Sequence, residues 1–454
     1  MCRLIKCAIL VAGLVLVPFA QVQCRAVQDI AAPVNIGNFG MAQLNYHGPV
    51  TSGREAVLII LHILFKAKRQ TDGSYLVRTV AYAERPALQE GQDFAPVPSK
   101  LNITLQHEDQ KGVWQPLQLS NLGVLQHQGP FIHEANIPEA LAARDFRLRV
   151  LDWPIYYTVR VPDIAKQNPS GPMLNDHGPF RNAIVIGDIH ITNVTLAAQV
   201  IATHMAHHLA LGFHLYLLYA RGAELIKALQ ANMVTAAFIA DGMLQFVSLD
   251  ALQVPLYDDG SSYEEMIKHR HDRSSSAYDS IKLIAYNHAS LALWGERFRL
   301  AVLDIDEMWS SQKAFTSVNS WFDRCFPGSD VIRASRVNMI CDVCMQTDVS
   351  ELHYFQQNWQ AADPSKVLQS FSRVMGFNKD PKSIFDPAKI GQVWLHAPFV
   401  LSGSVSTDVL IADAATDLAQ ECAFVVHLRD LFGKRTQDAA IMPDKYHQLV
   451  HRHN

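Results

Sequence analysis

Two aspartates separated by one residue, Asp304 and Asp306, directly follow the apolar segment Phe298–Leu303, and Glu307 comes next. In an open α/β sheet, ligands bind beyond the carboxyl ends of the strands, so these carboxylates would stand at a binding edge. Carboxylate oxygens are the ligands that hard divalent cations such as Mn²⁺ or Mg²⁺ prefer. The spacing therefore predicts a metal site at Asp304 and Asp306. The alternative is an acidic strand end that faces solvent or caps the next helix.

Four sequence blocks within residues 183–432 occur in the order that one enzyme family shows. They are His208–Phe213 with Tyr219, Asn287–Ala289 with Trp294 and Asp304–Met308, Lys382–Ile384 with Pro387 and Val393–Pro398, and Val425–Arg429. In these blocks the chain resembles glycosyltransferase family 92, a group of inverting enzymes with a GT-A-type nucleotide-sugar fold. The resemblance implies metal-dependent transfer of a hexose, galactose from a UDP-galactose donor, to a hydroxyl of a glycan acceptor with inversion.

The resemblance assigns metal-binding roles to three residues. Asp304 and Asp306 would hold Mn²⁺ or Mg²⁺ and, through it, the donor diphosphate. The cation would offset the negative charge that develops on the diphosphate as it leaves. His396 would be a third metal ligand or a diphosphate contact. For His396, a histidine buried beside Trp394 is the alternative.

Four other residues are candidates for substrate binding. Glu307 would lie behind the metal ligands or contact the sugar. His427 and Arg429 would bind phosphate, since an arginine offers a fixed fork of donors, and a structural role at a strand end is the alternative. Lys382 is a candidate of the same kind. Inverting transfer also needs a general base for the acceptor hydroxyl. The sequence offers three candidates and no rule to choose among them: Asp342, Asp348 and Glu351.

The chain departs from the family pattern at several positions that affect the inferred activity. Thr203 and His204 stand where the family tends to have Glu-Trp, Ala220 replaces an acidic or amide residue, Ala289 replaces a cysteine, and Met308 replaces an aromatic residue. These differences leave the donor sugar open. They also support an alternative function, a non-catalytic carbohydrate-binding protein that retains the glycosyltransferase fold. A metal-dependent secreted hydrolase ranks last, because no positioned nucleophile is visible.

Two short patterns have the spacing of zinc ligands. In His204-x-x-His207-His208, positions 204 and 208 share one face of a predicted helix. The glutamate of a His-Glu-x-x-His protease motif is missing, so packing or surface roles are favoured. Cys341 and Cys344 also have ligand spacing, but no second close pair of ligands follows them. In an oxidising compartment disulfides are the default. Three pairings are open among the cysteines beyond the leader, Cys325, Cys341, Cys344 and Cys422.

Residues 1–24 indicate entry into the secretory pathway. Arg3 and Lys6 precede the apolar run Cys7–Ala20, which is shorter than the roughly 20 residues of a bilayer span. We therefore expect a cleaved signal peptide, with a short uncleaved anchor as the alternative and the only expected membrane contact. Asn102 and Asn193 begin glycosylation sequons, which fits a protein of the Golgi lumen or a secreted one. The formal net charge of -4 gives no reason to expect nucleic acid.

Length and composition predict a globular protein of more than one domain. The 454 residues are 49% hydrophobic and 18% charged, as in ordinary packed domains. Short alternating runs separated by turns predict a β-sandwich-like accessory domain at residues 40–165. A polar segment at 163–176 predicts a linker, and strands alternate with helices over residues 177–435. That alternation predicts an α/β domain with a mixed, largely parallel sheet, and the resemblance implies that it is GT-A-like. Residues 436–454 would form a C-terminal tail.

Hydrophobic periodicity predicts the elements of both regions. In the β-rich region, strands are expected at 55–66, 75–82, 101–107, 146–153 and 156–161. In the α/β region, strands are expected at 183–189, 213–218 and 298–303, helices at 196–211, 222–231 and 279–294, and further apolar runs at 235–239 and 244–249.

Overall fold

The structure is a computed structural model that describes most of the chain between residues 41 and 428. The described residues are 41–52, 55–84, 103–117, 119–121, 130–150, 155–166, 180–187, 189, 194–220, 223–249, 276–311, 317–340, 373–394, 398–400, 411–413 and 422–428. Several predictions concern residues outside this set: the leader and the C-terminal tail, Asn102, Asn193, Cys341, Cys344, His396, Arg429 and the three candidate bases. In the described part, no helix combines the length and the apolar character of a membrane span.

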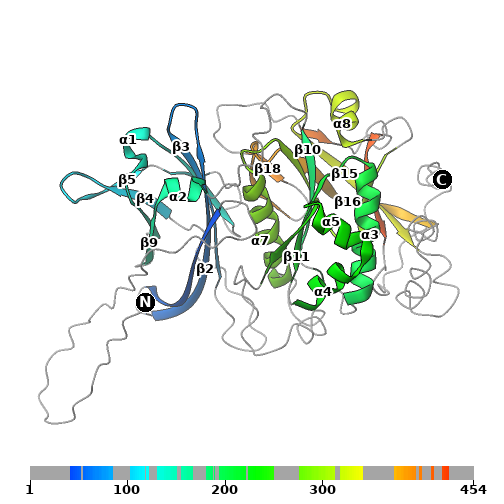
Figure 1. Cartoon of the computed structure of the whole chain (residues 1–454), viewed down its shortest axis with the longest axis horizontal. Coiled ribbons are helices and arrows are strands. Elements are labelled where there is room, and N and C mark those ends of the chain that lie inside the picture. Colours follow the sequence, from blue (N-terminus) through cyan, green and yellow to red (C-terminus); the bar gives the residue numbers. More distant parts are fainter. Residues whose placement is uncertain are drawn as a thin grey trace, which may run out of the picture.

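The first part of the chain forms two antiparallel sheets around one hydrophobic cluster (Figure 1). Among the described residues, one sheet has the order β1-β2-β3-β7-β6 and the other the order β5-β4-β8-β9. Buried and more exposed residues alternate along the strands β8 and β9, as in sheets with one face in a core. The strands are β1 (Met41–Ser52), β2 (Glu55–Arg69), β3 (Tyr75–Glu84), β4 (Ile103–Glu108), β5 (Trp114–Leu117), β6 (Ser120–Asn121), β7 (Phe131–Ile137), β8 (Phe146–Val150) and β9 (Ile155–Val159). Two short helices, α1 (Glu139–Ala142) and α2 (Val161–Lys166), accompany them.

The second part is built on a mixed sheet of nine described strands. Its first four strands, in the order β12-β11-β10-β13, are parallel neighbours. The order continues β16-β15-β20-β14, with β16 antiparallel to both neighbours and β14 antiparallel to β20, while β19 pairs with β15. The strands are β10 (Arg181–Ile186), β11 (Leu215–Ala220), β12 (Leu244–Ser248), β13 (Phe298–Leu303), β14 (Glu307–Ser310), β15 (Val331–Ile340), β16 (Arg373–Phe385), β19 (Ile411–Asp413) and β20 (Phe424–Leu428). A separate hairpin joins β17 (Ile390–Val393) and β18 (Pro398–Val400).

Helices cover both faces of the mixed sheet (Figure 1). Along β10, Ile184 and Ile186 belong to the hydrophobic cluster with α3, whereas Ala183 and Val185 belong to the cluster with α7. The apolar run at 235–239 lies in a helix because the Asn232 side chain caps it, accepting hydrogen bonds from two backbone N–H groups of the first turn. The helical segments are α3 (Val194–Ala210), α4 (Ala223–Ala231), α5 (Met233–Ala240), α7 (Ser276–Leu293), α8 (Val318–Ser320) and the π-helical turn Trp321–Cys325.

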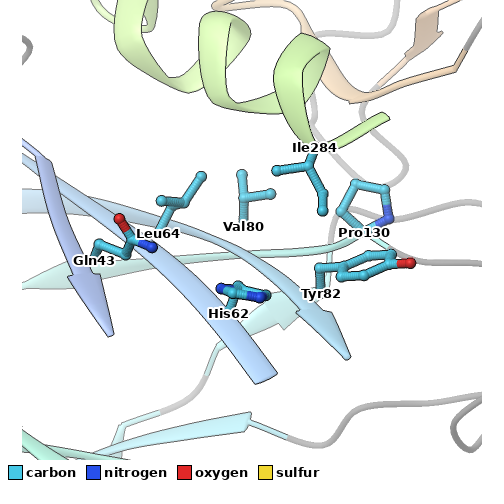
Figure 2. A pocket seen from close by; sticks show the side chains of 7 residues that line it. All are labelled: Gln43, His62, Leu64, Val80, Tyr82, Pro130 and Ile284. Carbon is cyan, nitrogen blue, oxygen red and sulfur yellow. The ribbon is translucent and has the colours of Figure 1, made fainter. Parts of the chain in front are cut away.

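The five-stranded sheet packs directly against α7, so the two parts share a core. Leu64 and Val80 belong to the same hydrophobic cluster as Ala285 and Ala289 of α7. Between these surfaces remains a cavity of about 10 Å³, which has room for about one water molecule. Figure 2 shows its lining residues, Gln43, His62, Leu64, Val80, Tyr82, Pro130 and Ile284. A sugar substrate does not fit this cavity, and the boundary between the two predicted domains stays a prediction.

Basic side chains of the five-stranded sheet bind backbone carbonyl groups of the second part. The Lys66 Nζ donates to the carbonyl oxygen of Ala292 at 2.5 Å, and the Lys68 Nζ donates to that of Gly295 at 2.5 Å. Both carbonyl groups lie at the C-terminal end of α7, where the helix dipole favours cations. Arg78 donates to the carbonyl oxygen of Pro387 and to that of Ile390, the first residue of β17.

Lys66 is expected to make stability rise with pH in the alkaline range. Burial lowers the pKa of Lys66 from 10.5 to about 8, although the charge of Glu296 opposes that shift. Between these two values the unfolded chain binds more protons than the folded one, so the free energy of unfolding increases with pH, by about 3 kcal/mol in all. Urea denaturation at pH 7.5 to 11 measures this. Lys66→Met should lack the rise, and Lys227→Met, which changes an exposed lysine of α4, should keep it. An equal rise in the wild type and Lys66→Met would contradict the assignment.

One disulfide bond joins Cys325 to Cys422 across 97 residues of sequence. It links the end of the π-helical turn to the residue that lies two positions before β20. Of the three pairings open from sequence, this bond leaves only the one that would also pair Cys341 with Cys344, both of which lie outside the described residues.

Candidate functional site

The acidic segment lies where the sequence predicted it, at the carboxyl end of a central parallel strand. β13 ends at Leu303, directly before Asp304, and pairs with β10 on one side. The segment turns back at once, because the Glu307 N–H donates to the Asp304 carbonyl oxygen at 3.0 Å. Leu428 of β20 then donates its N–H to the Asp306 carbonyl oxygen at 2.8 Å. These bonds hold the backbone of the acidic segment between the end of β13 and β20.

Asp304 lies between two lysines from different elements. Lys282 of α7 forms an ion pair with its Oδ1, and Lys382 of β16 contacts its Oδ2 at 3.0 Å. The Tyr286 hydroxyl donates to Oδ1 at 3.4 Å. Burial alone would raise the pKa of Asp304, but the two ammonium groups outweigh burial and hold the pKa well below its ordinary value. Asp304 is therefore a carboxylate at every physiological pH.

Glu307 is a fully buried anion. Its Oε1 contacts Arg336 of β15 at 2.9 Å, and its Oε2 contacts the Lys382 Nζ at 2.9 Å. Oε2 also accepts the backbone N–H of Asp304 at 2.8 Å. Lys282, Asp304, Lys382, Glu307 and Arg336 thus form one continuous chain of ion pairs, which we call the lysine–carboxylate network. Within it, Glu307 contacts basic side chains and backbone, and its side chain has no exposed surface for a sugar.

Asp306 and His427 lie side by side at the edge of this network. The His427 Nδ1 donates to the Asn338 Oδ1 at 2.8 Å, which directs Nε2 toward the Asp306 Oδ2 at 3.5 Å. Asn338 and His427 are neighbours in the pairing of β15 with β20, and Glu307 pairs with His427 in β14 and β20. Of the predicted phosphate-binding pair, His427 therefore reaches the acidic segment, whereas Arg429 lies outside the described residues.

The histidines of α3 bind the backbone of β14. The His204 Nε2 donates to the Glu307 carbonyl oxygen at 2.8 Å, and a ring nitrogen of His207 lies 2.7 Å from the Trp309 carbonyl oxygen. The Trp309 N–H donates to the His208 Nε2 at 3.0 Å. Burial lowers the pKa of His204 to about 3 and that of His208 well below its ordinary value, so both rings are neutral. These contacts agree with the packing role that the sequence favoured over a zinc site.

The described side chains do not fit a preformed site for Mn²⁺ or Mg²⁺. Both oxygens of Asp304 contact lysine ammonium groups, and both oxygens of Glu307 contact basic side chains. A hard cation with six or more oxygen ligands would have to displace these contacts. Within the described residues, no group of three or more His, Cys, Asp or Glu side chains is arranged to hold a metal ion. The predicted third ligand, His396, lies outside them.

The sequence indicates the acidic members of the site but only one of its basic members. Lys382 was expected to bind substrate, but Lys282, Tyr286 and Arg336 were not singled out. One signal was available, because Lys282 and Tyr286 are four residues apart and share a face of the helix that precedes β13. Arg336 carries no such signal. It lies 29 residues from Glu307 in the sequence, and no motif around it indicates that the two side chains meet.

Comparisons with known proteins add little to this geometry. No family model matches the chain, and no curated protein matches it. Among solved structures, the chain is similar to the crystal structure of mouse xyloside xylosyltransferase 1 in its apo form, with 14% identity and a TM-score of 0.21. That match covers 46% of this chain and 68% of the mouse chain. A likeness this distant carries no argument, and the resemblance to glycosyltransferase family 92 stays a prediction.

Proposed function

We propose that this protein is a glycosyltransferase that takes a hexose from a nucleotide-sugar donor and transfers it to a glycan hydroxyl with inversion. The observation that supports it is the lysine–carboxylate network at the carboxyl end of β13, the edge where α/β sheets bind their ligands. Buried ion pairs add little to the stability of a fold, because apolar residues of similar volume in their place often give an equally stable protein. Five charged groups kept together at this edge therefore favour a role in binding.

The charged groups divide by exposure into those that can meet a ligand and those that hold them. The side chains of Asp304 (26% exposed), Asp306 (13%) and Lys282 (12%) reach the surface. Those of Lys382 (1%) and Glu307 (0%) do not. In the proposal, the exposed side chains face the donor, and the two buried side chains hold the exposed ones in place. His396 and Arg429 keep the diphosphate-binding roles that the resemblance implies for them.

The proposed reaction needs one proton acceptor and a stabilised leaving group. The acceptor hydroxyl loses its proton to a general base, its oxygen bonds to the anomeric carbon, and the bond from that carbon to the diphosphate breaks. The products are the glycoside and a nucleoside diphosphate that retains the bonding electrons. Positive groups near the diphosphate lower the barrier, because the charge grows there in the transition state. We leave the base unassigned and propose UDP-galactose as the donor and the Golgi lumen as the compartment.

A panel of UDP-sugars offered to the full chain with a mixed glycan acceptor tests the function. We expect release of UDP together with a glycan product heavier by one hexose, detected by mass spectrometry. Asp306→Asn should lower turnover at least about tenfold, because it removes the carboxylate that the His427 Nε2 faces and that is proposed to contact the donor. Asp241→Asn, which changes a residue beyond the C-terminal end of α5, is the control. No UDP release with any donor, with or without Mn²⁺, would refute the proposal.

A non-catalytic carbohydrate-binding protein is the second candidate. It is favoured by one observation, that both carboxylates Asp304 and Glu307 are already neutralised by basic side chains. Such a protein would bind glycan and would show no turnover of any nucleotide sugar. Glycan binding by calorimetry in the absence of donor turnover would therefore replace the first proposal with this one.

A further inference from the structure

In the lysine–carboxylate network, two lysine side chains stand beside Asp304, where the sequence predicted a divalent cation. The ammonium groups of Lys282 and Lys382 both contact Asp304. Two ammonium groups carry the same charge as one Mn²⁺ ion. Glu307 contacts Arg336 and Lys382, each at 2.9 Å, so Lys382 is shared between the two carboxylates. A further divalent cation at Asp304 would meet two positive groups already in contact with its intended ligand, and like charges at such distances repel strongly in a partly buried site.

Separate elements deliver the two lysines to the same carboxylate. Lys282 projects from α7, which covers one face of the mixed sheet. Lys382 lies on β16, whose Ile384 pairs with Ala301 of the antiparallel neighbour β13, and this register brings Lys382 level with the carboxyl end of β13. The two ammonium groups therefore flank Asp304 at the edge where a donor would bind, each on its own oxygen.

We infer that Lys282, supported by Asp304 and Lys382, forms a metal-independent binding site for the diphosphate of the donor. This inference deepens the proposed function and rests on it for the identity of the donor. Lys282 is the contact residue, because 12% of its side chain is exposed, against 1% for Lys382. Lys382 is a positioning residue that holds Asp304, and Asp304 holds the Lys282 ammonium. The ammonium group of Lys282 offsets the negative charge that grows on the departing diphosphate. Lys282 does this by its charge alone and donates no proton to the diphosphate.

Equilibrium binding of two anions to the full chain tests this site directly. The probes are UDP and inorganic pyrophosphate, titrated by calorimetry in EDTA and, separately, in Mn²⁺. We expect both probes to bind in EDTA, with UDP affinity within about threefold of its value in Mn²⁺. Lys282→Met should weaken binding in EDTA about 10- to 100-fold, the effect of losing one hydrogen bond to a charged group. Lys282→Arg should retain most of the affinity, because it keeps the charge.

Controls and outcomes separate this inference from the proposed function. Lys227→Met, which alters an exposed lysine of α4, should bind like the wild type, and the unfolding midpoint of each variant checks its folding. Binding of UDP only in Mn²⁺ would overturn the inference and leave the proposed function standing. Pyrophosphate binding in EDTA that depends on Lys282, without turnover of any UDP-sugar, would support the site and refute the function. Failure of both probes to bind in EDTA would overturn the inference.

Discussion

Replacing Glu307 with glutamine is expected to lower the free energy of unfolding by about 3–5 kcal/mol, because it leaves buried charges without their partner. The Glu307 side chain is fully buried, and its oxygens contact Arg336 and Lys382 at 2.9 Å each. Those two basic side chains are 8% and 1% exposed, so water does not replace the lost anion. Urea denaturation of the wild type and the variant at neutral pH measures the difference.

Two comparisons test whether burial of charge causes this loss. Glu224→Gln removes the anion of the exposed pair with Lys227 on α4 and should have no measurable effect. Arg336→Met added to Glu307→Gln should recover part of the lost stability, because it removes a charge that the first substitution left unpaired. A loss in Glu307→Gln no larger than that in Glu224→Gln would contradict the buried network.

Removing the disulfide bond with Cys325→Ala and Cys422→Ala together is expected to lower the free energy of unfolding by about 2–5 kcal/mol. The bond spans 97 residues, and a cross-link over a long segment removes much conformational freedom from the unfolded chain. Its second half-cystine comes shortly before β20, the strand that carries His427. The double variant should therefore also bind UDP more weakly than the wild type.

Reduction of the wild type provides the matching control for the disulfide prediction. Denaturation in the presence of a thiol reductant should shift the wild type more than the double variant, because only the wild type has the Cys325–Cys422 bond to lose. Peptide mapping without reductant should recover a linked peptide that contains both cysteines. Recovery of Cys325 linked to any other cysteine would contradict the bond seen in the structure.

The sequence by itself determined the local elements and the position of the acidic segment. The strand predicted at 298–303 is β13 (Phe298–Leu303), and the helices predicted at 196–211 and 279–294 are α3 (Val194–Ala210) and α7 (Ser276–Leu293) within a few residues. These features follow from hydrophobic periodicity and from stop signals such as Gly212, whose φ of 82° suits the end of a helix. Periodicity is a property of neighbouring residues, so a single chain segment contains it.

Only the tertiary structure decided which groups meet Asp304. Its partners Lys282 and Lys382 lie 22 and 78 residues away in sequence, on a helix and on an antiparallel strand. Strand direction and neighbour order have no local signature, because an apolar run looks alike in parallel and antiparallel pairs. The carboxylates alone predicted a metal site. However, α7 and β16 bring basic side chains to Asp304, and these change the charge at the carboxyl end of β13. The chemistry of the site therefore depends on contacts that sequence spacing does not encode.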